Sequence, residues 1–474
     1  MNLLIGRKKE LAVLKGLING TRSEFVAIYG RRRVGKTYLI RTAFGNNFTF
    51  QVTGLSNATT DQQITNFHVA LQKFNPSASP TIPTNWFYAF QELIRFLEKQ
   101  PEGQKIIFID ELPWFDTHSS GFIQAIEHFW NSWASARQDI LLVTCGSAAS
   151  WMINKLLNNR GGLHNRVTKR FKIVPFTLGE CEQFLKAKNA VLERYEIIQL
   201  YMVLGGIPFY WDEVETNLSP AQNIENICFG ENGLLRSEFG NLFSSLFSHS
   251  ERHLAIVNAL AQKAKGLTRN EIIEATGKAN SGRLTELLEE LEESGFIRKY
   301  APFNKKTRSS LYQLVDFYVL FYLRFIRDTP LYDENNWINA VDNPKYRAWS
   351  GYAFEQVCLC HIAYIKKALG ISGIQTMTSS WRSSSTDSSA QIDLIIDRRD
   401  HIINLCEIKF SINPFSIDKK YAEELRNKIG VFKQETGTRK SVFLTFIATF
   451  GLKPNQYALG LVQNDFDMNI LFQE

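Results

Sequence analysis

The stretch from residue 25 to residue 42 constrains this chain more than any other. An apolar run, 25–29, is followed by Gly30-Arg31-Arg32-Arg33-Val34-Gly35-Lys36-Thr37 and then by Tyr38-Leu39-Ile40. This order predicts a buried strand, a glycine-bounded loop and the start of a helix. The loop fits the pattern G-x-x-x-x-G-K-[ST] at every position, and the strand and helix around it are the context that this pattern requires.

The residue types in this loop predict a site for ATP and Mg²⁺. Gly30 and Gly35 permit conformations that a Cβ atom would block, so successive backbone N–H groups can turn inward around a phosphate chain. Lys36 can reach the outer phosphates, and the Thr37 hydroxyl can bind Mg²⁺ at the helix N-terminus. We therefore predict that the nucleotide is bound by Gly30, Arg31, Arg32, Arg33, Val34, Gly35, Lys36 and Thr37.

Two further apolar runs end in polar side chains. The run 105–109 is followed by Asp110 and Glu111, and the run 140–146 is followed by Ser147. Parallel strands deliver such residues to their carboxyl ends, where ligands of open α/β sheets bind. We predict that Asp110 binds Mg²⁺ and that Glu111 orients and deprotonates the attacking water. Ser147 either contacts the outer phosphate or the water, or simply faces solvent.

An arginine near the γ-phosphate is expected to stabilise charge in the transition state. Arg166 is the first candidate and Arg160 the second. A surface role, or a role facing nucleic acid, is the alternative for each. The arginine can come from the same subunit or from a neighbour, so a homo-oligomer stays open.

Length and composition indicate the number of domains, the kinds of partner and the compartment to expect. The 474 residues exceed one ordinary core and predict about three domains. A formal net charge of +7 leans toward polyanions such as nucleic acid without demonstrating them. Six scattered cysteines fit a reducing cytosol, and no uninterrupted apolar run reaches about 18 residues. We expect a cytoplasmic protein without a membrane partner.

The first part of the chain resembles a known group of ATPases. The resemblance is carried by Leu4-Ile5-Gly6-Arg7, the loop 30–37, Phe108-Ile109-Asp110-Glu111, Cys145-Gly146-Ser147 and Gly205-Gly206-Ile207-Pro208. These motifs look like those of the archaeal and bacterial P-loop ATPases related to the AAA+ and STAND groups. The resemblance implies an α/β fold over residues 1–235, with a parallel-sheet ASCE ATPase core followed by a helical lid.

Residues 236–330 follow the plan of a winged helix-turn-helix. Three helical patterns, ending in the helix 281–294, precede two short strands around the basic turn 304–308. The helix that would read DNA carries Glu286, Glu289, Glu290, Glu292 and Glu293, and a phosphate backbone repels such a face. Arg283 and the basic turn favour contact with DNA. We favour a connector or protein-docking role, and DNA contact remains the alternative.

Residues 331–474 bring together side chains suited to a second chemistry. A helical pattern contains Glu355, the following strand contains Asp393, and the next strand contains Glu407 and Lys409 on one face. Three carboxylates and a lysine can hold Mg²⁺ and activate water for attack on a phosphodiester. We predict Asp393 and Glu407 as metal ligands, and Glu355 and Lys409 as further catalytic residues.

The order of these residues resembles the PD-(D/E)XK nuclease superfamily, although no proline precedes Asp393. The resemblance implies a C-terminal α/β restriction-endonuclease-like domain. Structural ion pairs also gather acids and a lysine, so binding without cleavage stays open.

Together, the two ends predict an ATP-binding and ATP-hydrolysing protein whose nucleotide state controls a metal-dependent nuclease-like domain acting on DNA or RNA. The alternative is a STAND-like switch, in which ATP sets the conformation and the C-terminal domain binds nucleic acid or a protein without cleaving it. A transcriptional regulator is the weakest reading, because the helix that would read DNA is acidic.

Overall fold

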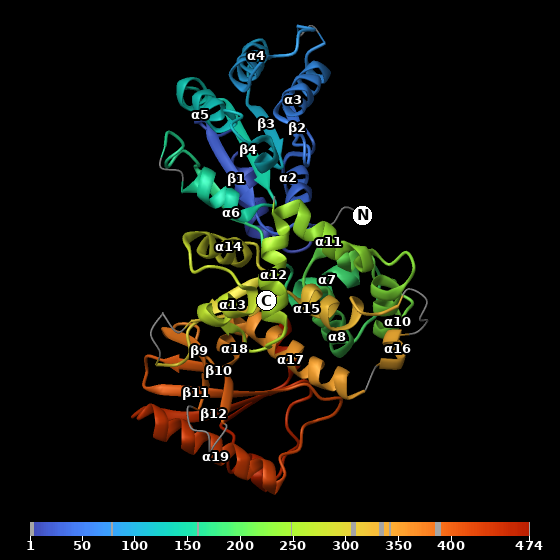
Figure 1. The fold of residues 1–474 in the computed structure, drawn as a ribbon, viewed down its shortest axis with the longest axis vertical. Coiled ribbons are helices and arrows are strands. Elements are labelled where there is room, and N and C mark those ends of the chain that lie inside the picture. Colours follow the sequence, from blue (N-terminus) through green and yellow to red (C-terminus); the bar gives the residue numbers. More distant parts are fainter. Residues whose placement is uncertain are drawn as a thin grey trace. The chain divides into compact units, whose positions relative to one another are not determined.

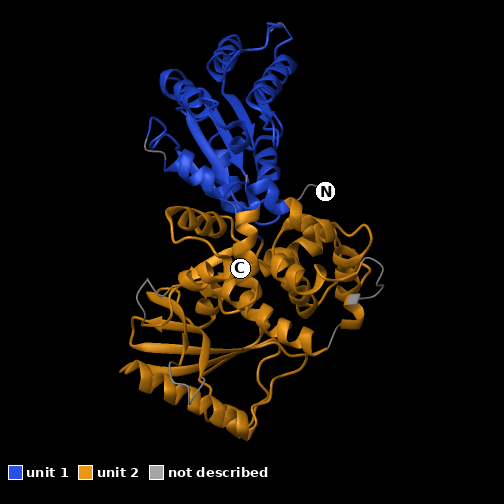
Figure 2. Cartoon of the chain, in the orientation of Figure 1, with its two compact units in different colours: residues 1–175, 242–250 blue, residues 176–241, 251–474 orange. Residues whose placement is uncertain are grey.

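The computed structural model describes residues 4–76, 79–158, 161–247, 249–304, 310–330, 336–340, 343–383 and 390–473. The chain forms two compact units (Figure 2). Unit 1 contains residues 1–175 and 242–250, and unit 2 contains residues 176–241 and 251–474. The division into domains 1–235, 236–330 and 331–474 stays a prediction.

Unit 1 is built on a parallel five-stranded sheet with the order β2-β3-β4-β1-β5 (Figure 1). The strands are β1 (Glu24–Tyr29), β2 (Phe50–Thr53), β3 (Lys105–Asp110), β4 (Ile140–Gly146) and β5 (Lys169–Lys172). Every residue of β3 and β4 is buried, as expected for parallel strands covered on both faces. The predicted parallel-sheet ATPase core is confirmed.

Helices cover this sheet and bury an aromatic core. They are α1 (Lys8–Gly16), α2 (Lys36–Phe44), α3 (Thr60–Phe74), α4 (Trp86–Glu98), α5 (Phe122–Ser132) and the short α6 (Ala149–Trp151). Trp86 lies at the centre of the core, with its ring 4.9 Å from Phe122 and 5.5 Å from Phe115. The frequent phenylalanines of this segment thus serve packing.

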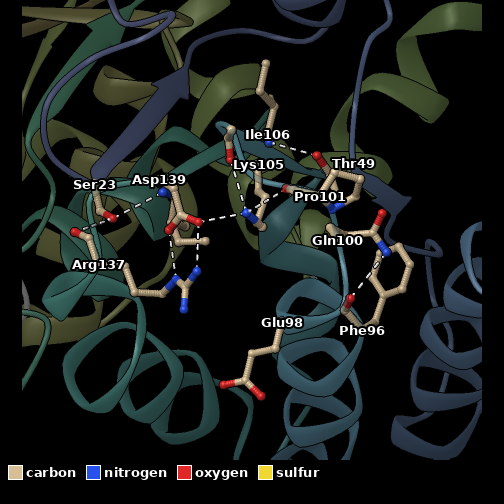
Figure 3. A network of polar contacts seen from close by, with 12 residues as sticks. Ser23, Thr49, Phe96, Glu98, Gln100, Pro101, Lys105, Ile106, Arg137 and Asp139 are labelled. Atoms are coloured by element: carbon tan, nitrogen blue, oxygen red, sulfur yellow. Dashed lines mark hydrogen bonds and ion pairs between the residues drawn. The ribbon is translucent and has the colours of Figure 1, made fainter.

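The amino ends of the strands are joined by a network of polar contacts (Figure 3). Lys105 Nζ lies 2.7 Å from Asp139 Oδ2, and Arg137 contacts both oxygens of the same carboxylate. Ser23 Oγ donates to the Arg137 carbonyl and accepts from the Ile140 N–H. Hydrogen bonds from Arg137 lower the pKa of Asp139 to about 2. This edge is structural, since the polar residues predicted to bind nucleotide follow the opposite ends of the strands.

A helical region follows residue 175 in the chain. It contains α7 (Leu178–Ala187), α8 (Arg194–Leu204), α9 (Pro208–Asp212), α10 (Pro220–Ile224) and α11 (Leu234–Leu246). Among the helices of the described ranges, none combines the length and the apolarity that crossing a membrane requires.

The middle of the chain has the predicted three helices and hairpin. The helices are α12 (Ser250–Ala261), α13 (Arg269–Thr276) and α14 (Gly282–Glu293), and the hairpin is formed by β7 (Ile297–Tyr300) and β8 (Leu311–Leu314). An additional short strand, β6 (Leu267–Thr268), pairs with β8 and gives the order β6-β8-β7. Residues 305–308 of the predicted basic turn 304–308 lie outside the described residues.

The segment between this hairpin and the last sheet is helical and aromatic, with α15 (Phe317–Phe321), α16 (Asn336–Ala340), α17 (Pro344–Cys360) and α18 (Ile362–Ala368). The helical pattern expected around Glu355 is α17, and α18 follows it after a break at His361. Phe321, Phe325, Trp337 and Trp349 pack their rings against one another, which buries the aromatic surface of the segment.

The C-terminal part is a mixed five-stranded sheet with the order β13-β12-β11-β10-β9. Its strands are β9 (Thr376–Arg382), β10 (Gln391–Arg398), β11 (Ile402–Lys409), β12 (Ser441–Ala448) and β13 (Asn464–Phe466). β9, β10 and β11 are antiparallel, whereas β11, β12 and β13 are parallel. Helix α19 (Lys419–Thr436) packs its apolar face on this sheet.

The hairpin of the middle segment is attached to this sheet. Pro302 forms a parallel bridge with Ser380 of the edge strand β9, and the Phe303 N–H donates to the Ser380 carbonyl at 2.8 Å. Phe303 is buried in the core beside Phe432 of α19, with ring centroids 5.2 Å apart. The middle segment and the C-terminal sheet therefore share a hydrophobic core.

Candidate functional site

The predicted phosphate loop connects β1 directly to α2. Gly30 has φ 150°, and Gly35, at the N-cap of α2, has φ 89°. Between them Arg33 also has a positive φ, of 69°. These values lie in a region that side chains with a Cβ rarely adopt, so the loop conformation depends on its glycines.

Lys36 is buried at the centre of the loop. Its Nζ donates to the carbonyl oxygens of Gly30 and Arg31, each at 3.0 Å, and to Ser147 Oγ at 2.9 Å. The ammonium group is therefore held by loop backbone and by the end of β4. This is the position that a lysine needs to reach phosphates bound by the loop.

Two carboxylates from the end of β3 complete the nucleotide site. Thr37 Oγ1 donates to Asp110 Oδ2 at 3.1 Å, which joins the two residues predicted to bind Mg²⁺. Glu111 accepts from Ser147 Oγ at 2.5 Å and from the Ser147 N–H at 2.9 Å. Ser147 thus bridges Lys36 and Glu111 and does not face solvent.

The residues present fit ATP with Mg²⁺. A hydroxyl and a carboxylate are the oxygen ligands that Mg²⁺ prefers, and the space around a Cβ added at Gly35 is empty within 4 Å, which leaves room for a ligand. Mg²⁺, when bound, stabilises negative charge on phosphoryl oxygens. Arg166 is exposed in the loop before β5, and Arg160 lies outside the described residues. The role of Arg166 stays a prediction.

The predicted acidic residues of unit 2 lie on adjoining elements. Asp393 belongs to β10, while Glu407 and Lys409 belong to β11. Leu394 pairs with Cys406 in the antiparallel register, so Asp393 and Glu407 are the next residues along the two strands. Glu355 comes from α17, which packs on β11.

Glu407 is engaged by three side chains. Tyr421 Oη donates to it at 2.6 Å, Lys428 Nζ at 2.7 Å, and Lys409 Nζ lies 3.0 Å away. Burial favours its neutral form, but the charges of Lys428 and Lys409 hold the pKa of Glu407 below its usual value. Tyr421 and Lys428 were not predicted; their i, i+7 spacing on one helical face was the available signal.

Glu355 and Asp393 line a cavity of about 550 Å³. Burial, followed by the charge of Asp393, raises the pKa of Glu355 to about 8. Asp393 accepts a short hydrogen bond from Gln391. Lys265, Arg298 and Arg382, which the sequence did not single out, line the same cavity.

The three carboxylates of this site face different surroundings. Within the described ranges, no group of three or more His, Cys, Asp or Glu side chains is arranged to hold a metal ion. Glu407 faces two lysines, and Glu355 and Asp393 face the cavity. The metal-binding role of Asp393 and Glu407 therefore stays a prediction.

Comparison with known proteins finds relatives for the segment that contains the nucleotide site. Residues 4–214 match the family model described as the ATPase domain predominantly from Archaea. The uncharacterized protein MJECL04 of Methanocaldococcus jannaschii is 25% identical over 360 residues, which cover 75% of this chain and 76% of that protein. The Walker-type ATPase PABY2304 of Pyrococcus abyssi is similar in fold, with a TM-score of 0.50 and 18% identity over 68% of this chain and 96% of that one.

The matched segment contains all the described residues of the nucleotide site, from Gly30 to Ser147. The family match and the loop geometry together indicate that residues 4–214 form an ATP-binding P-loop domain similar to the ATPase domains of this predominantly archaeal family.

Proposed function

We propose that ATP binding and hydrolysis in this domain control a metal-dependent, nuclease-like site in unit 2 that acts on DNA or RNA. The observation that carries the proposal is the placement of Asp393 and Glu407 on neighbouring strands, with Lys409 beside Glu407 and Glu355 on the adjoining helix. Carboxylates on adjacent strands with a nearby lysine suit attack by water on a phosphodiester. The C-terminal domain is then restriction-endonuclease-like.

The residues have distinct roles in this proposal. Asp393 and Glu407 bind the divalent cation, Glu355 supplies the third carboxylate, and Lys409 orients the water. In the ATPase domain, Glu111 orients and deprotonates the water, and Arg166 of the same or a neighbouring subunit stabilises charge on the γ-phosphate.

We further propose that residues 236–330 are a winged helix-turn-helix used as a connector. Arg283, the cation of α14 expected to favour DNA, is paired with Glu286 at 2.8 Å. Glu290 of the same helix contacts His253 of α12 at 2.6 Å. With its arginine neutralised, the acidic helix is poorly suited to bind a phosphate backbone.

One observation favours a second candidate, a STAND-like ATP switch whose C-terminal domain binds nucleic acid or a protein without cleaving it. Glu407 is held by Lys409 and Lys428 in ion pairs of 3.0 and 2.7 Å. Such a carboxylate has to break its ion pairs before it can bind a cation. A purely structural role for these ion pairs also explains why acids and lysines gather here.

The test is cleavage of mixed DNA and RNA by the full chain with Mg²⁺ or Mn²⁺, with and without ATP. The comparison variants are a double Asp393→Ala and Lys409→Ala change, and Lys36→Ala. We expect the unmodified chain to cleave in a way that depends on ATP, and we expect cleavage to be lost in the double variant and in Lys36→Ala. Absence of cleavage by the unmodified chain, with ATP hydrolysis intact, would overturn the nuclease and favour the switch.

A further inference from the structure

The cavity that holds Glu355 and Asp393 is also lined by the middle segment of the chain. Lys265 comes from the loop before β6 and Arg298 from β7, whereas Arg382 ends β9 of the C-terminal sheet. The Tyr300 hydroxyl donates to the Lys265 carbonyl at 2.6 Å, which fixes this loop against the hairpin. The attachment at Pro302 and Phe303 holds the hairpin on the sheet. The cavity is thus a composite of both segments.

Lys263 and Glu271, which also line the cavity, pair with each other at 2.6 Å, but its other cations do not pair with its carboxylates. Within the part of the chain that the structure describes, no Asp or Glu forms an ion pair with Lys265, Arg298 or Arg382. Arg298 instead donates to the amide oxygen of Gln313 at 2.8 and 2.5 Å. Desolvation lowers the pKa of Lys265, and the charges of Asp393 and Glu355 oppose that change. The three groups therefore interact through their charges without forming an ion pair.

Cations and carboxylates that share one cavity without pairing with each other suit a ligand that brings both negative and positive charge. Guanidinium and ammonium groups bind phosphate, and carboxylates bind the divalent cation that accompanies it. The volume lies in the range of sites for single small ligands, about 300–1,000 Å³. One nucleotide fits such a space, whereas the paired strands of a duplex do not.

Resting on the function proposed above, we infer that the cavity takes one nucleotide of a single-stranded nucleic acid, with Lys265 and Arg298 of the middle segment binding its phosphate. Glu355 and Asp393 face the accompanying cation. The middle segment then acts as one wall of the site and does not read a duplex through α14.

The test is binding of a fluorescent single-stranded oligonucleotide to the full chain, in separate DNA and RNA arms, against a blunt duplex of the same sequence. Ca²⁺ replaces Mg²⁺ so that binding is measured without cleavage. The variants are Lys265→Gln and Arg298→Gln. Lys299→Gln is the matched control, because Lys299 is the next residue on β7 and its ammonium group lies over the Tyr312 ring, outside the cavity lining.

We expect the single strand to bind in preference to the duplex. Each cavity variant is expected to weaken binding by about tenfold, the order of one lost charge-assisted phosphate contact, and Lys299→Gln to leave it within about twofold, as a lysine outside the site should. Arg298→Lys, which keeps the charge, should retain more binding than Arg298→Gln. Should Arg298→Gln fail to fold, Lys265→Gln decides the question.

Equal binding of duplex and single strand would overturn the inference. So would no binding by the unmodified chain, or a loss caused by Arg283→Gln and not by Lys265→Gln, which would place the nucleic acid on α14. Because the readout is binding, it separates this inference from the nuclease proposal. If the oligonucleotide binds in the cavity but is never cut, the nuclease proposal fails and the inference about binding stands.

Discussion

Gly30 and Gly35 bound the same loop, but different physical constraints require a glycine at each. A Cβ atom added at Gly30 would lie 2.2 Å from the Ile173 carbonyl oxygen, a distance that main-chain atoms cannot relieve without moving. A Cβ atom at Gly35 would meet nothing within 4 Å, and only the φ of 89° disfavours a side chain there. Gly30 is required by contact as well as by its φ of 150°, whereas Gly35 is required by conformation alone.

This difference predicts unequal effects of two alanine substitutions. Gly30→Ala should lower the free energy of unfolding of unit 1 by about 3 kcal/mol or more, because it forces two backbone segments apart. Gly35→Ala should cost about 1–2 kcal/mol, the usual penalty for a left-handed backbone with a Cβ. Urea unfolding without nucleotide measures both. Equal losses would show that the contact with Ile173 relaxes freely.

The hydrogen bonds of Glu111 lead to a second prediction at this scale. Glu111→Gln should slow ATP hydrolysis by about 10²–10⁴-fold, the usual contribution of a general base, and should leave ATP binding intact. Ser147→Ala removes the hydroxyl between Lys36 and Glu111 but keeps both charges, so it should cost less. Phosphate release and retention of labelled ATP provide the measurements. Hydrolysis at the normal rate in Glu111→Gln would assign the base to another residue.

At the scale of elements, the N-terminus of α7 is completed by an imidazole. The Leu178 N–H donates to His361 Nε2 at 3.0 Å, and His361 Nδ1 donates to the Val357 carbonyl at 2.7 Å. This arrangement requires a neutral ring with its proton on Nδ1. Burial lowers the pKa of His361 to about 4.

This histidine gives unit 2 a pH dependence. The folded pKa of about 4 lies below the ordinary value of 6.5, so the unfolded chain takes up the proton first. The contribution of His361 to the free energy of unfolding of unit 2 is therefore fully present above pH 6.5. It falls by on the order of 3 kcal/mol as the pH drops toward 4. His361→Gln should flatten this part of the profile, whereas His118→Gln, at an exposed position, should not. Urea unfolding at pH 4.5 and 7 compares them, and identical profiles would contradict the assignment.

The attachment of the hairpin to β9 predicts the effect of another substitution. Phe303 fills the core beside Phe432, so Phe303→Ala should destabilise unit 2 by about 3–5 kcal/mol. Met377→Ala is the control on β9, because Met377 is 67% exposed, and it should change stability by less than about 0.5 kcal/mol. Chemical denaturation reports both values. A small loss for Phe303→Ala would mean that the hairpin does not depend on this core.

Features formed by consecutive residues could be predicted from the sequence, whereas contacts between distant segments could not. The loop 30–37 and strands β1, β3 and β4 follow from uninterrupted motifs and apolar runs. β9 was missed because its sequence, Thr-Met-Thr-Ser-Ser-Trp-Arg, lacks an apolar alternation. The contacts of Glu407 with α19, and the cations lining the cavity, arise from packing between distant segments, which no local pattern encodes.

At the scale of the whole molecule, the ATPase match and the compact units do not have the same limits. The family match runs to residue 214, while unit 1 gives way to unit 2 after residue 175. The helical region that ends the ATPase domain therefore belongs to the same unit as the C-terminal sheet. Within unit 2, α8 of this region contacts α17, the helix that carries Glu355 of the cavity.

Two units predict two unfolding transitions. A ligand that binds only the folded state stabilises it, by about 2.7 kcal/mol at a hundred times its Kd. Non-hydrolysable ATP with Mg²⁺ should therefore raise the Tm of the transition assigned to unit 1 and shift the other much less, and Lys36→Ala should abolish the shift. Calorimetry with hydrogen exchange assigns the transitions. A single transition that moves as a whole would show that the units unfold together.

The close approach of Ile173 to Gly30 also bears on how such a chain can vary in evolution. The Ile173 N–H donates to the Tyr29 carbonyl at 2.7 Å, and Arg7 donates to the Val174 carbonyl. Two residues later the chain leaves unit 1. An inserted or deleted residue between β5 and this point would move Ile173 off the phosphate loop, so related sequences should keep the length of this segment and place their insertions elsewhere.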